Sequence, residues 1–79
     1  MTASEARALL ARLLGRIAPE ADLDAVDPDG PFQEALELDS MDFLNLVTAV
    51  EEDTGRSVPE RDYPALSTVS GFVAYLTTA

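Results

Sequence analysis

The sequence predicts an all-α fold, a small four-helix bundle of three main helices and one short helix, with a long ordered loop between the first two. Two observations support this prediction. Apolar residues recur at the helical spacing i, i+3, i+4 and i+7 in three separate segments. Turn-forming residues such as Pro19 and Gly55 lie where those segments end. A chain of 79 residues is enough for one such core, so we expect a single domain over residues 1–79.

The first helix should begin at Thr2. Thr2 and Glu5 have the spacing of a capping box, in which each side chain accepts a hydrogen bond from the other residue's backbone N–H. One wide apolar stripe follows, made of Ala6, Leu9, Leu10, Leu13, Leu14 and Ile17. Pro19 disfavours helical geometry at Ala18, so the helix should end there. We assign this helix a structural role.

Residues 19–39 show no sustained helical period, and residues 28–31 have the composition of a turn. A structureless loop of this length is uncommon in a compact domain. We therefore expect it to be held against the core by four apolar anchors, Leu23, Val26, Phe32 and Leu36. Pro31 suits the first turn of a short helical piece that ends near Leu36.

The second main helix should begin at Ser40 as N-cap, with Met41 as its first helical residue. Its core face comprises Phe43, Leu46, Val47, Val50 and Thr54. A second apolar stripe, Met41, Leu44 and Thr48, lies on the far side among Asn45, Glu51 and Glu52. Two interpretations of this stripe stay open. Met41 and Leu44 are ordinary isolated surface hydrophobes or belong to a helix that is buried on more than one side, or the stripe is a partner surface with an apolar centre and an acidic rim.

The last third of the chain should hold one more main helix. Gly55 should end the second helix, and residues 60–63 allow at most one helical turn because Pro64 interrupts them. Ser67 or Thr68 should cap the final helix, whose apolar stripe comprises Val69, Phe72, Val73 and Leu76.

The charge balance is strongly acidic, with 15 acids against five bases and a formal net charge of −10. Twelve of the acids lie between Arg16 and Arg56, and no base interrupts them. Such a field argues against a nucleic-acid partner and against an anionic membrane surface, and it favours basic protein surfaces. We expect no nucleic-acid or membrane partner, and a monomer.

The chain has no cysteine and no histidine, which removes thiolate chemistry, imidazole bases and the usual soft metal ligands. A calcium-loop interpretation of residues 27–30 fails because Ala25 and Leu36 occupy both end-ligand positions. We expect no metal, no catalytic residue and no enzymatic activity. The N-terminal segment is unlike a signal peptide, and no stretch approaches ~18 apolar residues, so we expect a cytoplasmic protein.

Ser40 beside Asp39 is the one candidate for group chemistry. A serine at a helix start is most often only a cap, and no base in the chain could activate it as a hydrolase nucleophile. Ser40 can nevertheless accept a group that another enzyme transfers to it.

The segment Leu38–Asp39–Ser40–Met41, with the acidic helix through Glu51 and Glu52, resembles the Asp-Ser-Leu phosphopantetheine attachment motif of acyl carrier proteins. The resemblance covers residues 30–77 without gaps; the first helix agrees in character only. It implies that a phosphopantetheinyl transferase moves 4′-phosphopantetheine from coenzyme A onto Ser40. The arm would then hold acyl intermediates as thioesters and present them to acyl-loading, acyl-transferring or condensing enzymes of fatty-acid, polyketide or specialised acyl metabolism.

The same resemblance implies roles for particular residues. Ser40 and Asp39 would bind the prosthetic group. Partner enzymes with basic surfaces would contact Met41, Asp42, Leu44, Asn45, Thr48, Glu51 and Glu52. An acyl pocket would be lined by Phe32, Leu36, Leu46, Val50, Val58, Leu66 and Phe72.

The sequence departs from the family pattern at several positions. Glu37 replaces a usual glycine, Met41 a usual leucine, and Asn45 an acid that is common in fatty-acid carriers. Phe43 and Phe72 replace smaller residues, and two rings beside the expected pocket argue against a long fatty-acyl cargo. The alternative from another class is an unmodified acidic helical module that binds a basic protein partner.

Overall fold

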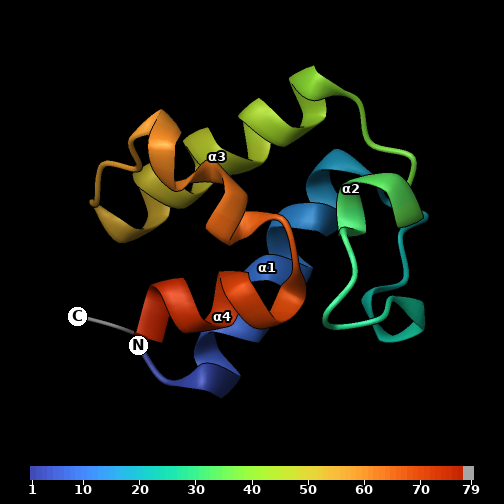
Figure 1. Cartoon of the computed structure of the whole chain (residues 1–79), viewed down its shortest axis with the longest axis horizontal. Helices are drawn as coiled ribbons and strands as arrows, with labels where there is room; N and C mark the ends of the chain where they lie inside the picture. The colour runs from blue at the N-terminus through green and yellow to red at the C-terminus, as the bar shows by residue number, and fades with distance from the viewer. Residues whose placement is uncertain (78–79) are drawn as a thin grey trace.

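Three long helices form the frame of the protein, and shorter helical pieces connect them (Figure 1). The computed structural model describes residues 1–77. Its elements are α1 (Ala3–Ile17), the 3₁₀ helix η1 (Leu23–Ala25), the short α2 (Phe32–Ala35), α3 (Ser40–Thr54), the 3₁₀ helix η2 (Glu60–Leu66) and α4 (Val69–Thr77). The predicted all-α bundle of three main helices and a short one is confirmed. In Figure 1, α3 lies above α4, and α2 lies to one side of both.

Helix α1 begins and ends as predicted. The Thr2 hydroxyl accepts from the Glu5 N–H at 3.1 Å, and the Glu5 carboxylate accepts from the Thr2 N–H at 2.9 Å. The bond from the Thr2 N–H, and after it a side-chain hydrogen bond from Thr2, lower the pKa of the Glu5 carboxyl because they stabilise its ionised form. Ala18 forms the C-cap. The apolar stripe is buried from Ala6 to Leu14 and packs mainly against α4 and α3.

The loop between α1 and α3 is ordered, and its predicted anchors reach the core. Leu23, Val26 and Phe32 are buried, and Leu36 is half-buried against the same cluster. Backbone hydrogen bonds also tie the loop to the start of α4: the Phe32 N–H donates to the Ser67 carbonyl at 3.0 Å, and the Ser70 N–H donates to the Pro28 carbonyl at 2.9 Å. The prediction of an ordered connection is therefore confirmed.

The prediction for the start of α3 is wrong by one residue. Asp39 is the N-cap, and Ser40 is already the first helical residue. The Asp39 carboxylate accepts from the Asp42 N–H at 2.8 Å, and the Asp42 carboxylate accepts from the Asp39 N–H at 3.3 Å. A carboxylate caps as well as a hydroxyl does, and its charge also suits the positive end of the helix dipole. At the other end Gly55 has φ 71°, which confirms it as the helix stop.

The prediction that residues 60–63 form at most one turn before Pro64 is also wrong, because η2 continues through Pro64 to Leu66. The fixed φ of proline is compatible with 3₁₀ geometry. Its carbonyl accepts from both the N–H and the hydroxyl of Ser67, so the helix ends with satisfied groups. Thr68, one of the two predicted caps, then begins α4 by accepting from the Gly71 N–H at 2.9 Å.

Helix α4 is held against its neighbours by a close backbone approach and by a polar contact. A Cβ atom at Gly71 would collide with the Ala65 carbonyl, so η2 and α4 approach closely there. The Tyr75 hydroxyl donates to the Asp62 carboxylate at 2.8 Å, and this bond, with some burial, raises the pKa of Tyr75.

Within residues 1–77, no helix has the length and apolar character needed to cross a bilayer.

Candidate functional site

Ser40 lies at the exposed start of α3, and capping does not use its hydroxyl. The Asp39–Asp42 capping box satisfies two of the backbone N–H groups at this end. Among residues 1–77, no hydrogen bond involves the Ser40 Oγ. The side chain therefore presents a free primary hydroxyl to solvent at the head of a rigid helix.

The environment of Ser40 suits a bound anionic ester as well as basic partners. The N–H groups of Ser40 and Met41 are among those that a helix leaves without intrahelical partners. Together with the positive end of the macrodipole, such groups favour a phosphate oxygen near the helix start. Asp39 is exposed and Asp42 is half-buried, so the surrounding surface remains acidic.

The second apolar stripe of α3 is open to solvent. Met41 is 63% exposed and Leu44 is 43% exposed, the largest exposures of large apolar side chains in α3. Asn45, Thr48 and Glu52 are exposed beside them. This excludes the interpretation that α3 is buried on more than one side. The stripe begins next to Ser40 and continues along the outer face of the helix.

Glu51 differs from the other residues predicted for this surface. Its carboxylate Oε2 accepts a hydrogen bond from the Val58 N–H at 2.8 Å, and the side chain is half-buried. Glu51 therefore holds the segment after α3 against the helix. Sequence reasoning missed this contact because it depends on how the chain returns after Gly55, which helical periodicity does not specify.

The seven residues predicted for an acyl pocket lie together, but as core. Phe32, Leu46, Val50, Leu66 and Phe72 are at most 1% exposed, and Val58 is 5% exposed. Leu36 is the half-buried member at the edge of this cluster. Beside it, Phe43 packs edge-on against Tyr63 with ring centroids 5.9 Å apart, which adds aromatic packing between α3 and η2.

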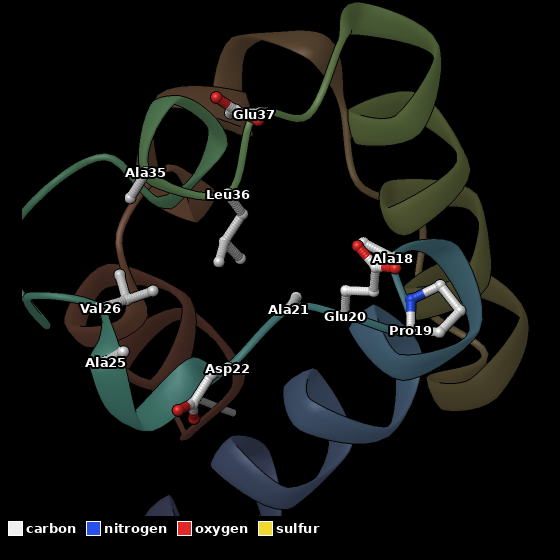
Figure 2. Close-up of a pocket in the computed structure, with 10 residues that line it drawn as sticks. All are labelled: Ala18, Pro19, Glu20, Ala21, Asp22, Ala25, Val26, Ala35, Leu36 and Glu37. Atoms are coloured by element: carbon white, nitrogen blue, oxygen red, sulfur yellow. The ribbon is translucent and has the colours of Figure 1, made fainter.

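A cavity of about 510 Å³ lies elsewhere, between the end of α1, the following loop and the end of α2 (Figure 2). We call it the loop cavity. Its apolar lining comprises Ala18, Pro19, Ala21, Ala25, Val26, Ala35 and Leu36. Its acidic lining comprises Glu20, Asp22 and Glu37. Of the residues predicted for an acyl pocket, Leu36 lines this cavity, and Val26, another predicted loop anchor, lines it as well.

Glu37 has the left-handed backbone conformation, with φ 56°. It follows α2, where the Leu38 N–H donates back to the Gln33 carbonyl at 2.8 Å in the manner of a Schellman helix end. This position favours glycine, because any side chain there costs about 1 kcal/mol. The geometry explains the glycine that is usual at this place in the family that the sequence resembles.

Among residues 1–77, no group of three or more acidic, histidine or cysteine side chains is arranged to hold a metal ion.

Comparisons with known proteins show the family to which this chain is similar. The model of the family described as "Phosphopantetheine attachment site" matches residues 4–76. An acyl carrier protein of Lactobacillus johnsonii is 38% identical over 55 residues, which is 70% of this chain and 69% of that protein. Acyl carrier proteins of Helicobacter hepaticus and Renibacterium salmoninarum are 36% and 33% identical over 55 and 63 residues, covering 70% and 80% of this chain and 72% and 73% of theirs.

The chain belongs to the phosphopantetheine attachment family. Within that family it is an acyl-carrier-type domain, a carrier with no enzymatic activity of its own whose prosthetic group is covalently attached 4′-phosphopantetheine. Carriers of this family work with acyl-handling enzymes. The alternative of an unmodified interaction module is not favoured.

Proposed function

We propose that Ser40 Oγ carries the phosphopantetheine arm and that the outer face of α3 is the surface that partner enzymes contact. The observation that supports this most is the free, exposed hydroxyl at the first position of α3. The lack of a histidine base in this chain is no obstacle, because the carrier is the substrate of a transferase. The Ser40 oxygen forms a bond to the phosphorus of the phosphopantetheinyl group of coenzyme A, the nucleotide half leaves, and a base of the transferase takes the serine proton.

The residues around Ser40 fit this group. The phosphodiester would lie at the helix start, near the N–H groups of Ser40 and Met41. Asp39 holds the helix end in place through its capping bond and leaves Ser40 exposed. When bound, the arm supplies a thiol for acyl transfer, a group that this chain lacks because it has no cysteine.

The partner surface combines an apolar centre with an acidic rim. Met41 and Leu44 offer exposed apolar area for affinity. Asp42, Glu51 and Glu52 supply the negative charge that would attract basic surfaces of the phosphopantetheinyl transferase and of acyl-loading, acyl-transferring or condensing enzymes. Asn45 and Thr48 complete the face. Because such attraction is screened by salt, association should slow as ionic strength rises.

Coenzyme A-dependent modification is consistent with a cytoplasmic location.

Intact-mass measurement after co-expression with a phosphopantetheinyl transferase tests the attachment site. The wild-type protein should gain one phosphopantetheinyl group, and Ser40→Ala should gain none. Ser70→Ala is the matched control, because Ser70 is an exposed serine in the first turn of α4. It should gain the group like the wild type. An unmodified wild type, or a modified Ser40→Ala, would refute the assignment.

The partner surface is tested by charge reversal. Glu52→Lys should slow modification by the transferase at low salt, and the difference should shrink at high salt. Glu60→Lys is a matched control, since Glu60 is an exposed glutamate at the start of η2, outside the partner face. Equal rates for both variants would show that the recognition face lies elsewhere.

A further inference from the structure

The loop cavity is lined by residues that precede Ser40 in the chain, whereas the outer face of α3 follows it. We infer that this cavity receives a lysine or arginine side chain of the phosphopantetheinyl transferase. The aliphatic stem of that side chain lies against the apolar lining, and its positive end lies among the carboxylates of the rim. The inference rests on the proposed attachment at Ser40, and it adds a second contact surface and the kind of group that fills it.

The walls of the loop cavity are apolar and short. Figure 2 shows the Leu36 side chain pointing into the opening, with Ala21 across from it and Val26 at its side. The volume of about 510 Å³ lies within the range of roughly 300–1,000 Å³ that is usual for small-molecule sites. A side chain that protrudes from another protein therefore fits between the walls.

The rim of the loop cavity carries negative charge only. Figure 2 shows Glu37 and Asp22 at opposite ends of the opening, with Glu20 on the α1 side. All three side chains are exposed, the lining contains no basic residue, and no ion pair within residues 1–77 involves any of them. Asp24, in contrast, is paired with Arg7 at 2.7 Å. The rim therefore has unpaired negative charge to offer a partner.

An apolar cavity with an acidic rim is complementary to one class of side chain. Lysine and arginine are apolar along their stems and positive at their ends, and they bury the stem while the charged end stays at the surface. A neutral apolar group would leave the carboxylates without a partner, and an acidic group would be repelled by them. The loop cavity therefore fits a basic side chain of a protein partner.

The backbone of Glu37 gives a separate indication. With φ 56° it has a left-handed conformation that strains any residue with a side chain and that glycine adopts freely. Among residues 1–77, the Glu37 carboxylate has no hydrogen bond or ion pair that would offset this strain. A carboxylate at a strained position, without a partner in its own chain, points to a contact with another protein.

The transferase is the partner whose surface must come closest to Ser40. Its active site has to reach the Ser40 oxygen itself, whereas an enzyme that acts on the thiol meets the far end of the arm. Glu37 lies three residues before Ser40, and three residues span at most about 11 Å even when fully extended. A specific interface buries about 800 Å² on each partner, which corresponds to a patch of about 16 Å radius. An interface centred on Ser40 therefore extends over the rim of the loop cavity at Glu37.

Removal of the rim charges tests the inference. The double substitution Glu20→Gln with Glu37→Gln keeps the length of both side chains and removes two charges. It should raise the KM of the transferase for the unmodified carrier about fivefold at low salt, with a smaller change in kcat. An unchanged KM would overturn the inference.

The matched control is Glu34→Gln with Glu60→Gln, because both glutamates are exposed and neither lines the cavity. This pair changes the net charge by the same amount and should leave the KM within about twofold of the wild-type value. Equal increases for the two pairs would also overturn the inference, because they would show a response to net charge alone.

Filling the cavity gives a second readout. Ala21→Lys places a basic side chain across from Leu36, where it can pair with the rim carboxylates. It should raise the KM by a similar factor, and the two glutamine substitutions should add little to it, because all three changes remove the same contact. Ala74→Lys is the matched control on the exposed side of α4 and should not reproduce the increase. A folded Ala21→Lys protein with the KM of the wild type would contradict the inference.

Mass measurement separates this inference from the attachment proposal. If the wild type gains no arm, or if Ser40→Ala gains one, the attachment proposal fails. If the wild type gains the arm at Ser40 and the rim variants keep the KM of the wild type, the attachment stands and the loop cavity is not a contact of the transferase.

Discussion

Helices α1 and α3 have the same length and the same type of start, yet they use their hydroxyl groups differently. Each has 15 residues and begins with a capping box. In α1 the hydroxyl of Thr2 is the cap, so it is occupied by the Glu5 N–H. In α3 the carboxylate of Asp39 is the cap, and the hydroxyl of Ser40 lies one residue later with no role in the helix end. The difference separates the residue that stabilises the helix from the residue that is available for modification.

Removing the cap of α3 should have the largest effect on the free energy of unfolding. Asp39→Ala deletes the acceptor for the Asp42 N–H and should lower that free energy by about 1–2 kcal/mol. Asp39→Asn keeps a capping oxygen and removes the charge, so it should retain most of the stability. Urea unfolding followed by circular dichroism measures both. Equal losses in the two variants would show that charge, not the capping bond, stabilises this end.

The far end of α3 provides a second contrast, between neighbouring glutamates. Glu51→Ala removes the acceptor for the Val58 N–H and should lower the free energy of unfolding by about 1 kcal/mol. Glu52 is exposed and has no such bond among the described residues, so Glu52→Ala should change stability by less than about 0.5 kcal/mol. Chemical unfolding of Glu51→Ala and Glu52→Ala measures the two free energies of unfolding. Indistinguishable midpoints would mean that the Glu51–Val58 bond contributes nothing.

Substitution of Glu37, which lies between α2 and α3, should be able to raise the stability of the protein. Glu37→Gly relieves a left-handed conformation that costs about 1 kcal/mol, but it also makes the unfolded chain more flexible. The net effect should be a small gain in thermal midpoint, whereas Glu37→Val should lose stability because a β-branched residue fits φ 56° poorly. Thermal unfolding of both variants gives the test. A more stable valine variant would rule out the left-handed backbone at this position.

The smallest expected effect is a shift in the pKa of Glu5, which belongs to the capping box of α1. Because hydrogen bonds from Thr2 lower the pKa of Glu5, that carboxylate adds stability above its unfolded pKa, and the contribution is lost as pH falls through the folded pKa. Thr2→Ala removes the hydroxyl bond and keeps the backbone one, so the pKa of Glu5 should move part of the way back toward its ordinary value. NMR titration of the Glu5 side chain follows it. An unchanged pKa would mean that the hydroxyl bond is not formed in solution.

Much of this fold follows from local sequence patterns. The apolar stripe that ends at Leu14, the helix stop at Gly55 and the anchors such as Phe32 were predictable, because periodicity and turn chemistry act over a few residues. The cap of α3 was mispredicted because aspartate and serine are almost equally good N-caps, and periodicity cannot choose between neighbours. Pro64 predicts an interruption because proline breaks α-helices, although a 3₁₀ turn accommodates it.

The rest of the site depends on contacts between distant segments. The Glu51–Val58 bond requires knowledge of the path after Gly55, and the left-handed backbone at Glu37 requires knowledge of how α2 ends. The loop cavity arises because three segments lie apart, and four of its ten lining residues are alanines, which carry no sequence signal. Such features come from tertiary packing, which single-residue preferences do not encode.

The central claim is that capping and modification are assigned to different residues at the start of α3, and Ser40→Ala tests it most directly. The free energy of unfolding of the unmodified Ser40→Ala protein should match that of the unmodified wild type to within about 0.5 kcal/mol, while the variant accepts no phosphopantetheine. A loss of about 1 kcal/mol or more, as expected for a deleted cap, would contradict the claim, because it would show that the Ser40 hydroxyl itself stabilises the start of α3.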